Sequence, residues 1–320
     1  MLRGYRLIDY LTQGYLLLVA LLVLVFHGDQ VPAWPFYLAG HAVLMGIIHA
    51  LIRTDLRSSN RVLELLRYFY PFLLFSFMYK ETVLLDSMFF QHHFDPVFLS
   101  LDRWIFGFQP SLVLMHRLPF PWVSETLYFS YFCYYLMIPG VGLALFSKDR
   151  ETFMRYVTVV SVVFYCCYLT YIFLPVIGPR AIVEDIPDFT RDVSFYVSHY
   201  DISTPAAIQG GIFFRIMGYI YENVEQAGGA AFPSSHVAVA LATLFFSWQF
   251  LKRFRWIHLL FVVLLMTATV YCRYHYVVDV FAGIATALVL VPIGDKLYAE
   301  LETVPCSESQ PQGGKPENGL

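Results

Sequence analysis

Two histidines and one aspartate near the C-terminal end of the sequence have the residue types and spacing for phosphoryl-transfer chemistry. His275 and Asp279 are four positions apart, so on a helix they would share one face. A carboxylate that holds one imidazole nitrogen fixes the tautomer and leaves the other nitrogen free to attack. His236 can serve as a separate acid or base. We therefore predict that His275, His236 and Asp279 are catalytic.

Two arginines and the start of a helix could bind the phosphate group. Arg180 and Arg273 offer forked N–H donors that match phosphate oxygens. The segment FPSSHV, which contains Ser234 and Ser235, predicts a helix N-terminus whose free backbone N–H groups form an anion site. We expect these four residues to hold the phosphate, and we expect the chemistry to need no metal or other cofactor.

The composition places these residues in a membrane protein. Of the 320 residues, 58% are apolar and 14% are charged, and the mean hydropathy is +0.58. Soluble domains carry about 25% charged residues, so a soluble globular protein is excluded. The net charge of −3 provides no basic field for nucleic acid, so nucleic acid is not an expected partner.

Apolar stretches of about 20 residues predict membrane-spanning helices. Eight such spans are predicted, at 8–26, 34–52, 68–90, 124–146, 153–176, 235–251, 256–272 and 278–296. The third is the weakest, since it contains Lys80, Glu81 and Asp86, and it could be short or broken. Segments within 91–123 and 206–224 mix apolar and polar residues and predict interfacial helices, either as a lid or lateral entrance for a lipid or simply as a cap.

The predicted fold is therefore an all-α integral membrane protein with about eight transmembrane helices. Two helices and a cytoplasmic loop occupy 1–64, an enzymatic core of six helices with interfacial helices on its outer face occupies 65–297, and a disordered cytoplasmic tail occupies 298–320. Eight spans put both termini on one side, together with two thirds of the 21 Lys and Arg residues. The positive-inside rule makes that side cytoplasmic. The candidate site residues then meet on the opposite, outer face.

The motifs resemble those of the type 2 phosphatidic acid phosphatase superfamily. Its P-S-G-H motif is similar to Pro233–His236, and its H-x3-D motif to His275–Asp279. The GPR triplet at 178–180, RYHYVVDVFAG and FDPVFLSLDRWIFGFQPS resemble the inositol phosphorylceramide synthase branch. The resemblance implies a six-helix core, a phosphohistidine intermediate and, in that branch, phospholipid and sphingolipid substrates.

Four positions depart from the superfamily pattern. The lysine of its K-x6-R-P motif falls at Phe173, and the proline of that motif falls at Ala181. An arginine expected six residues before the motif histidine falls at Thr269, and the glycine of P-S-G-H is Ser235. Arg273 stands near the missing arginine, two positions before His275. If both touch the phosphate, the helix that carries them must end close by.

We predict a metal-independent membrane enzyme that removes or transfers the phosphate or phospho-headgroup of a lipid, with water or an alcohol or lipid hydroxyl as acceptor. The oligomeric state is left open. The absence of N-x-S/T sequons and the excess of Arg over Lys favour a bacterial inner membrane, with the site facing the periplasm, or the lumen in a eukaryotic cell. Two alternatives are a transporter or channel, and an inactive scaffold that binds lipid phosphates.

Overall fold

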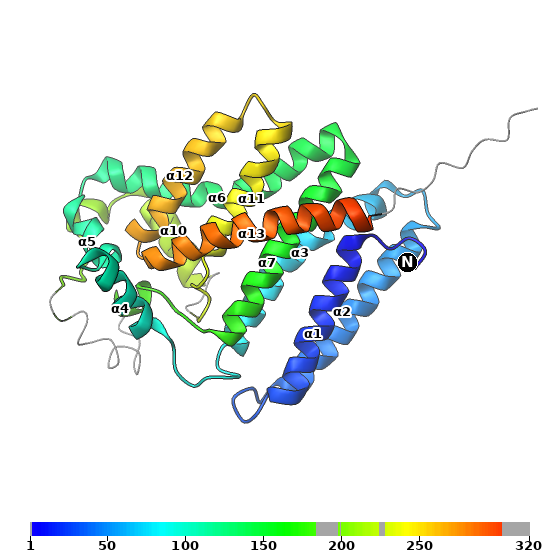
Figure 1. Cartoon of the computed structure of the whole chain (residues 1–320), viewed down its shortest axis with the longest axis horizontal. Helices are drawn as coiled ribbons and strands as arrows, with labels where there is room; N and C mark the ends of the chain where they lie inside the picture. Colours follow the sequence, from blue (N-terminus) through cyan, green and yellow to red (C-terminus); the bar gives the residue numbers. More distant parts are fainter. Residues whose placement is uncertain (1, 184–197, 199, 224–227, 303–320) are drawn as a thin grey trace, which may run out of the picture.

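The computed structural model describes residues 2–183, 198, 200–223 and 228–302. Within these ranges the regular elements are helices, which confirms the all-α prediction (Figure 1). Long helices are α1 Leu7–Phe26, α2 Trp34–Asp55, α3 Arg61–Leu85, α6 Pro121–Lys148, α7 Arg150–Phe173, α11 Ser235–Phe250, α12 Arg255–Tyr271 and α13 Val277–Leu301. Shorter helices are α4 Asp95–Phe106, α5 Pro110–Arg117, α8 Arg180–Val183, η1 Ala206–Ile208 and α10 Ile212–Asn223. The predicted tail starts at 298, but α13 continues to Leu301, so its first residues are helical; the part from 303 onward lies outside the described residues.

Six of the described helices are long and apolar enough to cross a membrane: α1, α2, α3, α6, α7 and α13. The apolar helices α11 and α12 are shorter, with 16 and 17 residues. The chain is thus an integral membrane protein, and the count of eight spans stays a prediction. The third predicted span is an unbroken helix that starts at the Asn60 cap and passes through Pro71.

Helix α7 is the centre of the bundle and packs against α1, α3, α6, α11 and α13. Its spanning window is 78% buried, twice the 39% of α1 and α6, which are the next most buried of the described spanning helices. This helix is apolar on all sides, as expected for a helix surrounded by others. The hydroxyls of Thr158 and Ser161 donate to the carbonyl oxygens of Met154 and Val157 one turn earlier, so these two polar groups need no partner on another helix.

The predicted interfacial segments are helical, as α4, α5 and α10. Proline stands in the first turn of α4, α5 and α6, where its missing N–H costs nothing. These short helices gather at one end of the bundle, which appears at the left of Figure 1, whereas the start of α1 and the end of α13 lie at the other end. The Leu7 N–H donates to Glu302 across 2.7 Å and ties those two ends together.

Candidate active site

Three connecting loops meet at the end of the bundle that carries α4 and α5. The loop after α7 and the loop before α11 form an isolated β-bridge between Val176 and Ala230. Gly178 has a φ of +99°, and a Cβ there would lie 2.6 Å from the Tyr274 carbonyl oxygen of the third loop. Only glycine allows that approach without strain. The loops that adjoin Arg180 and His236 and the loop that carries His275 are therefore held together by backbone contacts.

His275, Asp279 and His236 are buried and adjacent. The Nδ1 atom of His275 lies 3.4 Å from Asp279 Oδ2, an ion-pair distance without hydrogen-bond geometry. The Nε2 atom of His275 lies 3.3 Å from Nδ1 of His236. All three residues are less than 10% exposed. The predicted catalytic residues thus form a chain from carboxylate to imidazole to imidazole.

The loop between α12 and α13 positions His275. Helix α12 ends at Tyr271, and the backbone of Arg273 is left-handed, with a φ of 63°. The N–H groups of Tyr274 and His275 both donate to the carbonyl oxygen of Thr269. Burial lowers the pKa of His275 to about 4, so its imidazole is neutral at pH 7 and can act as a nucleophile.

Arg180 lies beside the two histidines. Its guanidinium carbon is 4.5 Å from the ring centre of Tyr221, which stacks face to face on Tyr274. Arg180, Tyr221 and Tyr274 line a cavity of about 40 Å³ together with His236 and His275. This cavity is a candidate phosphate site, with a cation on one wall and two imidazoles on another.

A family model described as the PAP2 superfamily matches residues 97–293. The chain belongs to the PAP2 superfamily. The same comparisons find no match among curated proteins or solved structures. The PAP2 match covers the predicted catalytic residues and all three loops, whereas α1, α2 and α3 precede it.

Two expected phosphate donors of this PAP2 site are engaged elsewhere in the structure. The Ser234 N–H donates to the Asp279 carbonyl oxygen across 3.1 Å, and the Ser235 N–H donates to the Tyr171 hydroxyl across 3.2 Å. The Ser234 hydroxyl accepts from Val237 N and caps α11. The prediction that these two N–H groups are free is therefore wrong, because the helix start is built into the protein interior.

Arg273 also points away from the catalytic cavity. Its two terminal nitrogens donate to the carbonyl oxygens of Ile202 and Ser203, across 2.6 and 3.1 Å. It lines a separate cavity of about 250 Å³, which Arg180 and Glu222 also line. The left-handed backbone at Arg273 turns its side chain onto this neighbouring loop, so the structure does not bring Arg273 and His275 onto one ligand.

Sequence analysis missed two carboxylates of α4 that position the site. Asp102 accepts from the N–H groups of Val277 and Val278, which caps α13. Asp95 accepts from the N–H groups of Ile177 and Gly178. Burial raises the pKa of Asp95, although these hydrogen bonds oppose the shift. Their spacing of seven residues put both on one face of the predicted interfacial helix, but nothing local indicated what they would bind.

The Tyr131 hydroxyl was also missed. It lies 3.1 Å from Nε2 of His236 and contacts the hydroxyl of Tyr221 as well. Tyr131 therefore fixes the orientation of the His236 ring from α6. In the described part of the chain, no group of three or more His, Cys, Asp or Glu residues is arranged to hold a metal ion.

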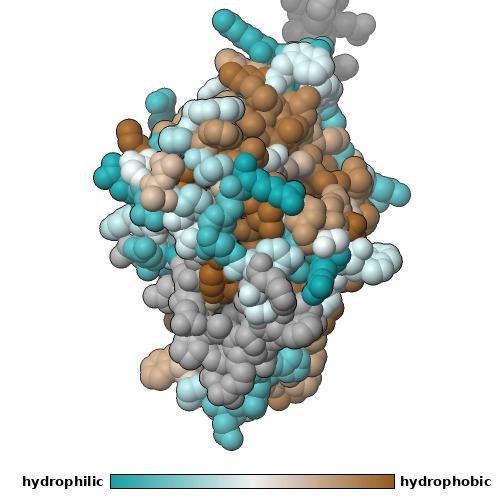
Figure 2. Space-filling model, turned by 90° about the vertical axis from the view of Figure 1, so that its left-hand side faces the viewer, coloured by the Kyte–Doolittle hydropathy of each residue, from teal (hydrophilic) through white to brown (hydrophobic). Residues whose placement is uncertain are grey.

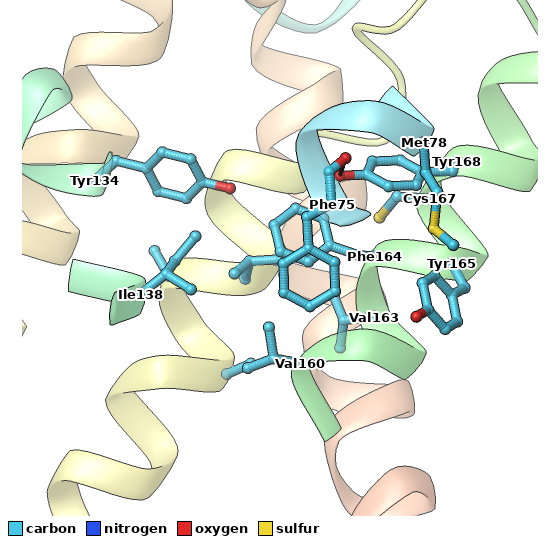
Figure 3. Packing of buried hydrophobic residues seen from close by; sticks show 14 of the residues in the cluster. Phe75, Met78, Tyr134, Ile138, Val160, Val163, Phe164, Tyr165, Cys167 and Tyr168 are labelled. Atoms are coloured by element: carbon cyan, nitrogen blue, oxygen red, sulfur yellow. Dashed lines mark hydrogen bonds between the residues drawn. The ribbon is translucent and has the colours of Figure 1, made fainter. Parts of the chain in front are cut away.

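A larger, apolar cavity reaches the site from the side. It has a volume of about 330 Å³ and is shared by α3, α6 and α7, with Ser235 and His236 at its inner end. In Figure 3, Tyr134 and Ile138 of α6 project toward Phe75 of α3 and Phe164 of α7. Figure 2 shows the end of the molecule with α4 and α5, where hydrophilic and hydrophobic surface meet.

Proposed function

We propose that this PAP2 protein cleaves or transfers the phosphate or phospho-headgroup of a lipid through a phosphohistidine on His275. The observation that carries this proposal is the arrangement of the His275 ring. Asp279 approaches one nitrogen, and the other nitrogen faces His236 at the cavity lined by Arg180. A neutral, oriented imidazole next to an acid and a cation is a nucleophile equipped for phosphoryl transfer.

In the first step, Nε2 of His275 attacks phosphorus, and the bond from phosphorus to the leaving alkoxide breaks as the P–N bond forms. His236, which carries a second proton once the anionic phosphate is bound beside it, gives that proton to the alkoxide and is left neutral. Asp279 stabilises the positive charge that develops on the His275 ring, and Arg180 stabilises the phosphoryl oxygens. In the second step, His236 takes a proton from water or an alcohol, whose oxygen attacks phosphorus and releases His275.

Substrate binding requires one imidazole ring to turn. The two facing nitrogens are 3.3 Å apart, which leaves no room for phosphorus between them. The Tyr131 hydroxyl is the partner of the opposite nitrogen of His236, so this contact is the natural pivot. We expect phosphate to displace the contact between the histidines and to bring Arg180 onto its oxygens.

The apolar cavity supports a lipid as the substrate. Its floor is formed by buried residues of α7, Phe164 and Tyr168, and its rim residues Ser76 and Pro139 are exposed on membrane-spanning helices. An acyl or isoprenoid chain in this cavity would point its phosphate toward His236. Because the chain comes from a bilayer that is as apolar as the cavity, the cavity determines where the phosphate lies and adds no hydrophobic gain of its own.

The acceptor distinguishes a phosphatase from a transferase. The motif resemblance to inositol phosphorylceramide synthase favours transfer to a hydroxyl. The 250 Å³ cavity supports this choice, because Glu222, Thr204 and Arg273 give it a polar lining and Arg180 borders both this cavity and the catalytic one. A polyol or lipid hydroxyl there would be close to the phosphohistidine.

We also propose that the active site faces the periplasm or the lumen, with the termini in the cytoplasm. The segment KRFR at 252–255 lies between α11 and α12, at the bundle end opposite the site. A cysteine introduced there should be labelled from the cytoplasm alone, and one near Asp201 should be labelled from outside. The reverse pattern would move the active site to the cytoplasm.

The test of the proposed function is a substrate panel on the purified protein in nanodiscs. Phosphatidic acid, a polyprenyl diphosphate, and phosphatidylinositol with ceramide are offered with and without alcohol acceptors, and free phosphate is scored against transferred product. We expect turnover of at least one lipid, and we expect it to survive excess EDTA because Arg180 supplies the positive charge. Folded protein that turns over none of these lipids would contradict the proposal.

A further inference from the structure

Helix α3 carries an unassigned cation into the apolar cavity. Lys80 is the one Lys or Arg among the described residues that line this cavity, whose inner end is Ser235 and His236. Helices α3 and α6 both pack against α7 but make few contacts with each other, so the cavity is a groove floored by α7. Lys80 is exposed on its rim, about one turn from the outer end of α3.

The stretch of α3 around Lys80 borders the catalytic cavity. Tyr79 lines both the apolar groove and the cavity that contains His275. Val83 packs so closely on Gly228 that a Cβ there would lie 2.2 Å from the valine side chain. Asp86 accepts from the Gly229 N–H across 2.9 Å. Lys80 therefore projects from a segment that is fixed against the loop before His236.

Lys80 has no hydrogen bond or ion pair with the described residues. Its neighbour Glu81 is paired with His41 of α2 on another face of α3, at 2.9 Å. An ammonium group on a spanning helix without a counter-ion is costly, so such residues generally serve a ligand. The four-carbon stem of lysine lets the charge reach a phosphate several ångströms away.

We propose that Lys80 binds the phosphate of a lipid whose chain lies in the groove between α3 and α6. This inference rests on the proposed function for the identity of the ligand. The phosphate would then be held between Lys80 on the membrane side and Arg180 on the opposite side. Lys80 would supply the positive charge of the superfamily's motif lysine, whose position is taken by Phe173. Phe173 stacks on Phe89, is 43% exposed and lines neither of the cavities described above that contain His236.

The test measures binding of a long-chain alkylphosphonate, which mimics the lipid phosphate but cannot be cleaved, to the full chain in nanodiscs. Lys80→Met should weaken binding about tenfold or more, which is typical for the loss of a charged hydrogen bond, and Lys80→Arg should retain most of it. Ser76→Trp should fill the groove and weaken the long-chain phosphonate but not methylphosphonate. Gly140→Trp is the matched control, because it fills a separate cavity on another face of α6.

Equal affinity of Lys80→Met and the unmodified chain would overturn the proposal, because a lysine that merely reaches the headgroups has no effect on this ligand. Equal effects of Ser76→Trp and Gly140→Trp would overturn the choice of groove. Absence of phosphonate binding by the unmodified chain would overturn both the role of Lys80 and the choice of groove. Binding that follows the expected pattern in a protein without lipid turnover would support the site and refute the proposed function, so the two failures are distinguishable.

Discussion

Two buried histidine–carboxylate pairs occur in the described part of this protein, and they have different surroundings. His41 of α2 pairs with Glu81 of α3 at 2.9 Å, and His275 pairs with Asp279 at 3.4 Å. The second nitrogen of His41 is buried without a partner, and His41 lines neither cavity that reaches His236. The second nitrogen of His275 faces His236 at a cavity.

The residue types alone do not make a pair catalytic. The His41–Glu81 pair holds α2 against α3, where burial of two polar groups is compensated by their contact. At the His275–Asp279 pair, Nε2 of His275 faces a second imidazole and borders a cavity that is also lined by Arg180. We therefore assign the first pair to helix docking and the second to chemistry, and the following predictions compare them.

The largest expected difference is in the rate. Asp279→Asn and Glu81→Gln replace a carboxylate by an amide of the same shape in each pair. Asp279→Asn should lower kcat on a lipid phosphate by about 10²–10⁴-fold, because the charge on the His275 ring is no longer stabilised. Glu81→Gln should leave kcat within about twofold, because its pair makes no contact with the catalytic cavity. Equal losses in the two variants, measured under the same conditions, would refute the division of roles.

The reverse difference is expected in stability. His41→Leu removes one partner of a buried pair and leaves Glu81 alone, which costs about 3 kcal/mol of unfolding free energy. His275→Ala should cost less, because its ring already borders a cavity. Unfolding in mixed micelles, followed by tryptophan fluorescence, measures both variants. A His41→Leu protein as stable as the parent would mean that the pair does not hold α2 in place.

The pH dependence of stability should report the burial of His275. Its pKa is about 4 in the folded protein, below the usual value near 6.5, so the unfolded chain binds more protons between these pH values. Stability is then lost as pH falls from about 6.5 to 4, by about 3 kcal/mol in total. The His275→Ala variant should not lose this unfolding free energy of about 3 kcal/mol over the same pH range. Parallel stability curves for the two proteins across this interval would contradict a buried, neutral His275.

The smallest effect concerns the caps. Asp102→Asn weakens the two hydrogen bonds from Val277 and Val278 and should cost about 1 kcal/mol. It should also lower kcat about tenfold at most, because α13 carries Asp279. Asp149→Asn is the matched control, since Asp149 caps α7 through Thr152 at the far end of the bundle. Asp149→Asn should lose about as much stability as Asp102→Asn but keep the kcat of the parent. If both variants lose the same part of kcat, Asp102 does not act through its position next to the active site.

The proximity of His275, Asp279 and His236 could be predicted because their signals are local. His275 and Asp279 share one short motif, and span counting places His236 at the same membrane face. The helices were predictable from long apolar stretches. The continuity of α3 was not, because Glu81 is paired with His41, forty positions away. Pairs that distant leave no local pattern.

The contacts of individual donors could not be predicted. Arg273 was expected at the phosphate, but its direction depends on a left-handed backbone and on the loop at Ile202, which is remote in the chain. The N–H of Ser235 is taken by Tyr171 for the same reason. Lys80 was known only as a charge that weakened a predicted span. Its place on the rim of the cavity that leads to His236 depends on the packing of α3 on α7.

The central claim is that His275 carries the phosphoryl group, and trapping that intermediate tests it most directly. The protein is mixed with a lipid or aryl phosphate labelled with ³²P, denatured within the first turnover, and analysed for acid-labile, base-stable label mapped to a peptide. We predict label on His275 in the parent, none in His275→Ala, and accumulation in His236→Ala with the activated aryl phosphate, whose leaving group needs no proton. Label that persists in His275→Ala and disappears in His236→Ala would contradict the account.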